Sequence, residues 1–234
     1  KPLEPFWGKV KCFAMKSSYE CETPSTVAFS TVSGSAFYKQ ALEVVTVSQS
    51  LTQEQKDIAK WWADGGGSPT PPGHWVAIEN QLVSKLNLGL GKAAEMYVLV
   101  NMALADAFIS CWDAKYKFNL LRPKTYINKY IAGNSNWNSF IGTPPFPEYP
   151  SGHSVSSGAA AEILTTLFGN VAFTDNANTD LGLQPRSFNS FYQAADEAAV
   201  SRLYGGIHYR EANENGVKQG KMVGQSVMKN IKLK

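Results

Sequence analysis

The stretch from Lys92 to Lys115 carries the longest apolar helical pattern in the sequence and constrains the fold more than any other feature. Apolar side chains recur in it every four residues, and a second row lies beside the first. A helix that is apolar over so wide an arc is predicted to lie at the centre of a helical bundle. The two rows are Met96, Val100, Leu104, Phe108 and Trp112, and Ala93, Tyr97, Asn101, Ala105 and Ile109.

The rest of the chain is predicted to form further helices joined by loops. Thr52, followed by Gln55 three residues later, has the pattern of a capping box at a helix start, and Gly169 suits a helix end. No alternating stretch is long enough to predict a sheet, so we expect an all-α fold. The other predicted helices are 35–49, 52–63, 73–86, 125–131, 151–168, 187–204 and 208–231.

Length and composition favour one domain. The 234 residues are enough for one substantial core, and 44% hydrophobic with 18% charged residues is the balance of a globular protein. We expect a single catalytic domain over 1–234, with an irregular segment at about 1–34 and a helical core at about 35–234. Because Lys1 is the first residue and no signal-like stretch follows it, we also expect that an upstream segment is missing.

Several classes of protein are disfavoured by the same composition. No apolar run approaches the roughly 18 residues of a membrane span. A formal charge of +3 without a dense lysine and arginine patch argues against nucleic acid as a partner. Cys12, Cys21 and Cys111 lack the spacing of zinc ligands. Cys12 and Cys21 either close a small loop or stay free, whereas Cys111 lies in an apolar helix and is expected to be buried.

Two segments are predicted to be loops from their composition. Residues 64–73 are rich in glycine and proline, and tryptophans and His74 flank them. This segment is therefore either a flexible linker or the wall of a cavity. His74 is expected to have a structural role, unless it lies near the entrance of a site. Residues 171–186 form a second, polar loop.

The segment from Phe146 to His153 has the features of an anion site. Pro147 and Pro150 disfavour a helix in the residue before each, so the chain is expected to arrive extended and to begin a helix at Ser151. The first backbone N–H groups of a helix have no intrahelical partners and can bind an anion. His153 would place a titratable imidazole beside that anion.

Cationic side chains in two other segments can complete such a site. Lys115 and Arg122 are seven residues apart, so on one continuous helix they would share a face about 10 Å apart. The alternative is that both are solvated surface charges. Arg202 and His208 flank the pair Gly205-Gly206, which either turns both side chains toward one point or forms an ordinary turn with a capping arginine.

Taken together, these segments supply a cage for a tetrahedral oxyanion. Charge-assisted hydrogen bonds contribute about 1.5–3 kcal/mol each, so the cage could hold a multiply charged anion tightly. Its members are the cations Lys115, Arg122 and Arg202, the donors Ser151 and Gly152, and the imidazoles of His153 and His208.

The same residues resemble a signature shared by vanadium-dependent haloperoxidases and type 2 phosphatidic acid phosphatases. The three parts of the signature are Lys115 to Arg122-Pro123, Pro150-Ser151-Gly152-His153, and Ser201-Arg202 to His208. The resemblance to bacterial haloperoxidases covers most of the chain from about Pro5, including 61–65, 71–75, 105–107 and 112–116. It implies an all-α helical bundle of the haloperoxidase/acid phosphatase type.

The resemblance implies an enzyme that uses a vanadate cofactor to oxidise a halide with hydrogen peroxide to hypohalous acid. His208 would bind vanadium directly. His153 would be the acid/base that helps hydrogen peroxide replace a hydroxide, and Lys115 would activate the bound peroxide for attack by the halide. Phe146 and Trp112 match apolar residues of the halide pocket. The groups implied to hold the vanadate oxygens are Lys115, Arg122, Ser151, Gly152 and Arg202.

The resemblance also implies a second candidate, an acid phosphatase in which His208 is the nucleophile and His153 protonates the leaving group. Phosphatases usually carry an aspartate four residues after the histidine, where this chain has Ala212. The partner that orients His208 must then lie elsewhere. Asp106, Asp113 and Glu211 are the alternatives for that partner. An oxyanion-binding protein without turnover is the third candidate, disfavoured because it gives His153 no purpose.

Further expectations follow from the family and from single residues. Bromide or iodide is expected as the halide rather than chloride, because chloride demands the strongest oxidant. An organic halogen acceptor, a homo-oligomer and a periplasmic or secreted location are also expected. Glu148 either pairs with a cage arginine or has no role, and the same alternatives hold for Asp64.

Overall fold

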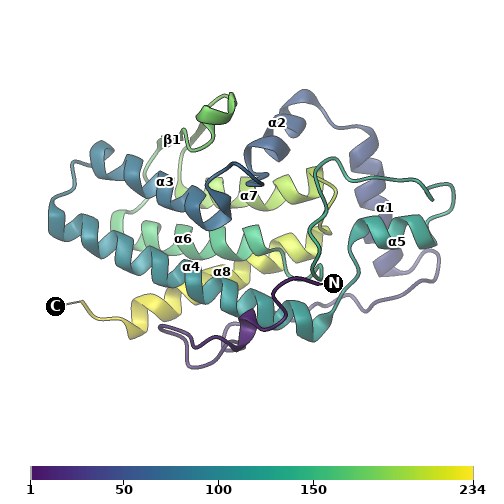
Figure 1. The fold of residues 1–234 in the computed structure, drawn as a ribbon, viewed down its shortest axis with the longest axis horizontal. Helices are drawn as coiled ribbons and strands as arrows, with labels where there is room; N and C mark the ends of the chain where they lie inside the picture. Colours follow the sequence, from purple (N-terminus) through teal and green to yellow (C-terminus); the bar gives the residue numbers. More distant parts are fainter. Residues whose placement is uncertain (1, 234) are drawn as a thin grey trace.

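The computed structural model describes residues 2–233, and Figure 1 shows a predominantly helical molecule. The helices are α1 (Ala36–Gln49), α2 (Gln53–Trp61), α3 (Thr70–Lys85), α4 (Leu90–Phe118), α5 (Pro123–Tyr130), α6 (Gly152–Phe168), α7 (Phe191–Tyr204) and α8 (Arg210–Asn230). The shorter elements are the 3₁₀ turns η1 (Trp7–Lys9) and η2 (Thr179–Leu181) and the strands β1 (Phe173–Asp175) and β2 (Arg186–Phe188). The all-α prediction is therefore confirmed.

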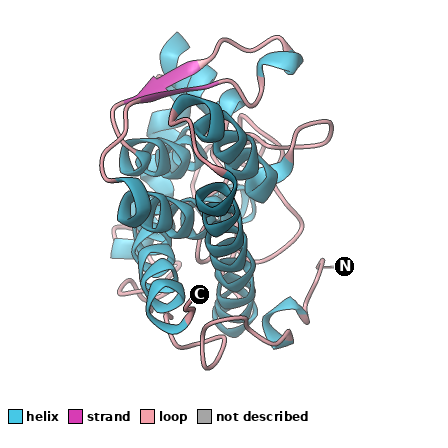
Figure 2. Ribbon diagram, turned by 90° about the vertical axis from the view of Figure 1, so that its left-hand side faces the viewer, coloured by secondary structure: helices cyan, strands magenta, loops and turns pink. Residues whose placement is uncertain are grey.

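Helix α6 lies at the centre of the bundle and packs against α4, α7 and α8. Figure 1 shows α4, α6 and α8 crossing the middle of the molecule, and Figure 2 shows helices of the bundle end-on, with the two strands at one edge. Residues 154–161 of α6 are all buried, and each is serine, alanine, glycine or valine. Such small side chains let neighbouring helices approach α6 closely. Helix α4 is central as predicted, but it shares that place with α6.

Glycines set the closest approach, between α6 and α8. A Cβ added to Gly158 would lie 2.5 Å from the carbonyl oxygen of Val217, and one added to Gly220 would overlap the carbonyl oxygen of Val155. Glycine is therefore required at both crossings, and these contacts fix the distance between the two helices.

Helix ends agree with the predicted ones in part. The capping box of Thr52 and Gln55 is present. Helix α4 runs past Lys115 but ends at Asn119, whose φ is 47° in the left-handed region, and α5 begins only at Pro123. The prediction that Lys115 and Arg122 could share one continuous helix is therefore wrong. The predicted start of the last helix at His208 is also wrong, since α8 begins at Arg210 and leaves His208 in the preceding loop.

The predicted loop 171–186 contains a short antiparallel hairpin. Strand β1 pairs with β2, with Phe173 opposite Phe188. Three residues per strand are too few to give an alternating pattern in the sequence, which explains why no sheet was predicted. The hairpin also corrects the predicted helix start at Ser187, because that residue lies in β2 and α7 begins at Phe191.

The N-terminal segment is largely irregular, as predicted. It is held against α4 by hydrogen bonds and by aromatic packing. The Asp106 carboxylate accepts hydrogen bonds from the backbone N–H groups of Phe13, Ala14 and Met15, at 2.7 to 3.0 Å. The ring of Trp7 packs against two aromatic rings of α4. All three cysteines are free, and Cys111 is buried as predicted.

Residues Leu90–Tyr130 are long and apolar enough, by length and composition, to cross a membrane, with a mean hydropathy of 1.3. This finding differs from the expectation that no apolar run approaches the length of a membrane span. In the structure 61% of its apolar window is buried inside the protein, and the stretch is divided between α4 and α5. Packing within the bundle therefore accounts for its apolar character.

The contact between α6 and α8 gives a prediction about stability. Gly158→Ala is expected to lower the free energy of unfolding by about 1–3 kcal/mol, because the two helices must separate to admit the methyl group. Gly91→Ala is the matched control, since its Cβ would meet nothing within 4 Å. Urea denaturation of both variants measures the difference, and equal midpoints would contradict the packing argument.

Candidate functional site

The three segments singled out in the sequence meet at one cavity of about 480 Å³. Lys115, Arg122 and Ser151 are buried at 0, 6 and 0% exposure. Arg122 contacts His208, and Lys115 contacts the segment that leads to Ser151. The predicted residues that line the cavity itself are Trp112, Phe146, Gly152, His153, Arg202 and His208.

His208 is held from both sides of its ring. Its Nδ1 lies 2.8 Å from Oε1 of Glu148, and its Nε2 lies 3.0 Å from Nη1 of Arg122. Because the guanidinium can only donate, Nε2 is the acceptor, and Nδ1 carries the proton that it donates to Glu148. Burial, with Arg122 and Lys115 nearby, holds the pKa of His208 well below its usual range. The ring is therefore neutral, with the Nε2 lone pair on the side of the cationic groups.

Glu148 is the partner that orients His208. Its Oε1 also accepts the backbone N–H of Tyr209 at 3.0 Å, so one carboxylate oxygen fixes both the ring and its backbone. Burial raises the pKa of Glu148 to about 7, against the opposing effect of Arg122 and Lys115.

Three other acids were the predicted alternatives for the partner that orients His208, and all three are wrong. Asp106 binds the N-terminal segment, and Glu211 accepts hydrogen bonds from Ser25 and Thr26 near the surface. The structure gives no contact of Asp113 with His208. A signal for Glu148 existed, because it lies inside the predicted anion motif, three residues before Ser151.

One N–H donor group of Arg122 is not used in a hydrogen bond within the described residues. Its Nε donates to the Phe146 carbonyl oxygen and its Nη1 to that of Ile207, both at 2.9 Å. Its Nη2 is buried and has no partner among the described residues. A buried charged donor without an acceptor is costly, so an oxygen of a bound anion would satisfy a real deficit here. Burial lowers the pKa of Arg122 to about 10, which leaves it charged at neutral pH.

Lys115 is fully engaged with the backbone. Its Nζ donates to the carbonyl oxygens of Pro147, Glu148 and Pro150 at 3.0, 2.9 and 2.5 Å. An ammonium group has three protons, so these three acceptors use all of them. Burial lowers the pKa of Lys115 to about 8. The observed role of Lys115 is to shape the proline-rich segment and to bring positive charge behind the cavity.

Ser151 and Gly152 form the predicted helix start. Ser151 is the N-cap of α6, and its Oγ accepts the N–H of Ser154 at 3.4 Å. The hydroxyl proton of Ser151 remains available to an acceptor. A Cβ on Gly152 would lie 3.6 Å from the ring of Trp112, so the absence of a side chain leaves room beside the first N–H groups of the helix.

His153 and Arg202 face the same cavity from α6 and α7. Arg202 donates from Nε to the Oγ of Ser201 at 2.9 Å and is 1% exposed. Burial, and then the charge of Arg202, lower the pKa of His153 to about 4. His153 is therefore neutral at neutral pH.

Asp64 is a site residue to which the sequence analysis gave no definite role. Its Oδ2 lies 3.5 Å from Nε2 of His153, and it lines the cavity. The interpretation of the loop 64–73 as a cavity wall is therefore confirmed. His74 lies beneath this wall at 0% exposure, so a place at the cavity entrance is excluded.

The N-terminal segment supplies a wall that sequence reasoning missed. Leu3, Glu4 and Trp7 line the cavity, and the Trp7 ring lies 4.9 Å from that of Trp112. About a hundred residues separate the two tryptophans, and no local pattern in the sequence pairs them. Phe146 packs on the same ring at 4.9 Å, so one side of the cavity is aromatic.

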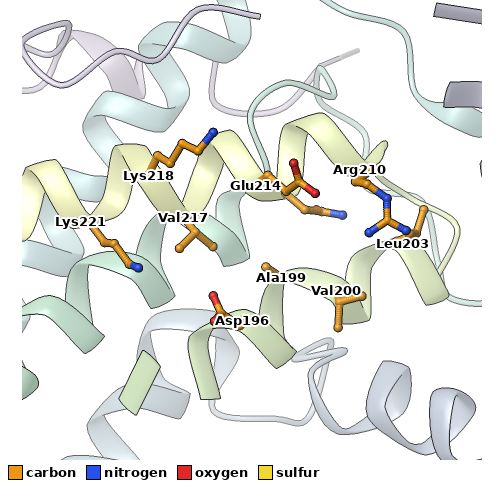
Figure 3. Close-up of a pocket in the computed structure, with 10 residues that line it drawn as sticks. Asp196, Ala199, Val200, Leu203, Arg210, Glu214, Val217, Lys218 and Lys221 are labelled. Carbon is orange, nitrogen blue, oxygen red and sulfur yellow. The ribbon is translucent and has the colours of Figure 1, made fainter. Parts of the chain in front are cut away.

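A second hollow, of about 360 Å³, lies between α7 and α8 and contains none of the cage residues. Figure 3 shows charged side chains around an apolar floor formed by Ala199 and Val217. The charged residues that line it lie on the outer surface of the helices and none is buried; they are Asp196, Arg210, Glu214, Lys218 and Lys221. In the part of the chain that the structure describes, no group of three or more His, Cys, Asp or Glu could hold a metal ion.

Comparison with known proteins assigns the family. A family model described as "VCPO second helical-bundle domain" matches residues 95–233, which is more than half of the chain. The chain belongs to this family. The chain is similar to the protein in the crystal structure of the first bacterial vanadium-dependent iodoperoxidase. The two sequences are 44% identical, and the structures superpose with a TM-score of 0.93 over 99% of this chain and 57% of that one.

Two further proteins are similar to the chain at lower sequence identity. The vanadium chloroperoxidase of Curvularia inaequalis is 24% identical over 88% of this chain and 45% of its own length. A holo-type bacterial vanadium-dependent chloroperoxidase shares the fold, with a TM-score of 0.78 at 17% identity over 96% of this chain and 54% of that one. The chain thus spans about half the length of the relatives that it matches.

The lowered pKa of His153 predicts how stability depends on pH. Between about pH 6.5 and 4 the unfolded chain binds a proton at this residue and the folded chain does not, so stability falls as the pH falls through that window. His153→Asn should remove a loss on the order of 3 kcal/mol. Urea denaturation at pH 7 and pH 4.5 measures this change, and an equal loss in the parent and the variant would contradict the assignment.

Proposed function

We propose that this chain binds vanadate and oxidises a halide with hydrogen peroxide to hypohalous acid. The observation that carries the proposal is the pairing at one cavity of a neutral His208, with its Nε2 directed toward the cations, and an Arg122 guanidinium whose Nη2 has no partner among the described residues. Membership of the VCPO family supports it.

The donor set fits vanadate. The oxygens of vanadate accept hydrogen bonds from N–H and O–H groups and its vanadium can take a nitrogen ligand, and this cavity offers both kinds of group. His208 would be the nitrogen ligand through Nε2, after Arg122 shifts its Nη1 contact to an oxygen of the anion. The groups that would hold the oxygens are Arg122, Arg202, Ser151 and the backbone N–H of Gly152. Lys115 would contribute its charge from behind the Pro147–Pro150 backbone.

When bound, vanadate would supply a Lewis acid that activates hydrogen peroxide without a change in oxidation state. His153 would hold or release a proton at its Nδ1, because its other ring nitrogen, Nε2, lies near Asp64. An anion in the cavity offsets the charge of Arg202, so the pKa of His153 rises toward neutrality when the site is loaded. His153 thereby becomes an acid/base in the pH range where it is needed.

The aromatic wall would bind the halide. Trp112 and Phe146 lie on the cavity together with Trp7, and these rings partly desolvate an anion beside the cationic cage. Nε1 of Trp112 is buried and has no partner among the described residues, so it is a donor that a halide could accept. Bromide or iodide is the proposed substrate, and the similarity to an iodoperoxidase at 44% identity supports this choice.

Other parts of the proposal rest on the family resemblance alone. An organic molecule is the proposed halogen acceptor, and a homo-oligomer and a periplasmic or secreted location are proposed with it. A phosphatase reaction at the same cage is the second candidate, because the Nε2 lone pair of His208 that would bind vanadium is also the nucleophile for a phosphate ester.

Turnover assays distinguish the two reactions. The protein loaded with vanadate should halogenate a phenol dye in the presence of peroxide and bromide or iodide, and should show less activity with chloride. Phosphate release from a phosphate ester without any vanadate-dependent halogenation would assign the phosphatase instead.

Two variants test the assignment of the histidines. His208→Ala should lose vanadate retention, because the nitrogen ligand is gone. His153→Ala should retain vanadate but turn over about 10²–10⁴ times more slowly, as expected for a lost acid/base group. Lys124→Ala, at an exposed site on α5, is the control. Normal vanadium retention by the His208 variant would refute the ligand assignment.

Binding of the anion should also take up protons. Since burial and Arg202 lower the pKa of His153 to about 4 and a bound anion should raise it, vanadate binding at pH 6 is expected to add up to one proton at this residue. Calorimetric titrations in two buffers of different ionisation enthalpy measure the uptake. His153→Ala should bind with about one proton less, and unchanged uptake would assign the proton to another group.

A further inference from the structure

Behind the His153 side of the cavity lies a buried chain of charged groups that the proposed reaction does not yet use. His74 donates from Nδ1 to Oδ1 of Asp64 at 2.8 Å and from Nε2 to Oδ2 of Asp175 at 2.7 Å. All three side chains are at most 1% exposed. Both ring nitrogens therefore face carboxylates, which requires that each carries a proton.

His74 is an imidazolium, because both of its ring nitrogens face carboxylates. Burial alone lowers the pKa of His74, but hydrogen bonds to Asp175 and Asp64 outweigh it and raise the pKa to about 9. Burial likewise raises the pKa of Asp64, but His153 and His74 outweigh it and hold the pKa of this carboxyl well below its usual range. The imidazolium of His74 thus helps to keep the buried Asp64 carboxyl ionised.

Asp175 is anchored independently of His74. It accepts the indole N–H of Trp61 at 3.0 Å and the backbone N–H of Ala177 at 2.9 Å. The ring of His74 also stacks on Trp62, with centroids 4.3 Å apart. Contacts with β1 and with tryptophans at the end of α2 therefore fix the position of the imidazolium independently of its hydrogen bond to Asp64.

The two oxygens of Asp64 are used unequally. Oδ1 accepts from His74 and from Asn178 Nδ2 at 3.1 Å, whereas Oδ2 is buried and has no partner among the described residues. That free oxygen lies 3.5 Å from Nε2 of His153, which also lacks a partner there. The hydrogen bonds to Oδ1 determine which way the carboxylate turns, and so they direct Oδ2 at the acid/base.

We propose that His74, anchored on Asp175, is a positioning residue that orients the Asp64 carboxylate so that Oδ2 receives the proton-bearing Nε2 of His153. The inference rests on the proposed function, since it specifies how the acid/base of that reaction is held. The cluster lies on the far side of Asp64 from the cavity, so His74 acts through Asp64 and touches neither the anion nor the halide.

Two amide variants separate orientation from stability. In His74→Asn the amide NH₂ takes the place of Nδ1, so the hydrogen bond to Asp64 is kept and that to Asp175 is lost. In His74→Gln the amide reaches the place of Nε2, so the bond to Asp175 is kept and that to Asp64 is lost. Both variants remove the same charge, and Lys85→Ala, exposed on the same helix, controls for unrelated changes.

Crystal structures of the vanadate-free variants give a readout independent of turnover. The Oδ2–Nε2 contact of 3.5 Å should be kept in His74→Asn and lost in His74→Gln. In turnover, kcat of the Gln variant should lie about 10-fold or more below that of the Asn variant, while KM for halide and the vanadate affinity differ by less than about twofold. Equal kcat values, or an Asp64 that keeps its place in the Gln variant, would overturn the proposal.

A measurement on the unmodified protein covers the case in which a variant does not fold. The chain has three histidines, so nitrogen NMR resolves each ring. His74 should show two protonated ring nitrogens at pH 7.5, and a neutral His74 would overturn the proposal. If the unmodified protein shows no vanadate-dependent halogenation, the proposed function fails, and the crystallographic comparison still decides whether His74 positions Asp64.

Discussion

The hydrogen-bonded row of Glu148, His208 and Arg122 holds the site together. Glu148 receives both the ring N–H of His208 and the backbone N–H of Tyr209, and Arg122 ties the other ring nitrogen to the Phe146 and Ile207 carbonyl oxygens. Three segments that are distant in the sequence are joined by these bonds. Because each member is buried, the loss of any one leaves another charge or donor without a partner, at a cost of several kcal/mol.

Positive charge is in excess around the cavity, and the fold supports this excess through the backbone. Lys115, Arg122 and Arg202 face the buried acids Glu148 and Asp64. The three carbonyl oxygens that surround Lys115 solvate its charge without neutralising it, since they are dipoles and not anions. A bound oxyanion would complement the remaining positive charge and accept a hydrogen bond from Nη2 of Arg122, which has no partner among the described residues.

Close packing of α6 makes this arrangement possible. The helix carries Gly152 and His153 at its first turn and small side chains behind them, so α4, α7 and α8 can approach it from different sides. Each neighbour, or a loop at its end, brings one part of the cage. Larger side chains on α6 would move these elements apart, and hydrogen bonds of about 3 Å tolerate little displacement.

The sequence by itself determined the helical class, most helix positions and, in three separate segments, the candidate cage residues Lys115, Arg122, His153, Arg202 and His208. Helical periodicity, capping and the spacing within each segment are local features. Only the tertiary structure decided that Glu148 is the acid that orients His208. It also decided that Lys115 donates its hydrogen bonds to backbone carbonyl groups, and that Trp7 and Asp64 form walls of the cavity. These are contacts between segments far apart in the chain. No local pattern in one sequence encodes them, since they depend on how closely the helices pack and where the loops end.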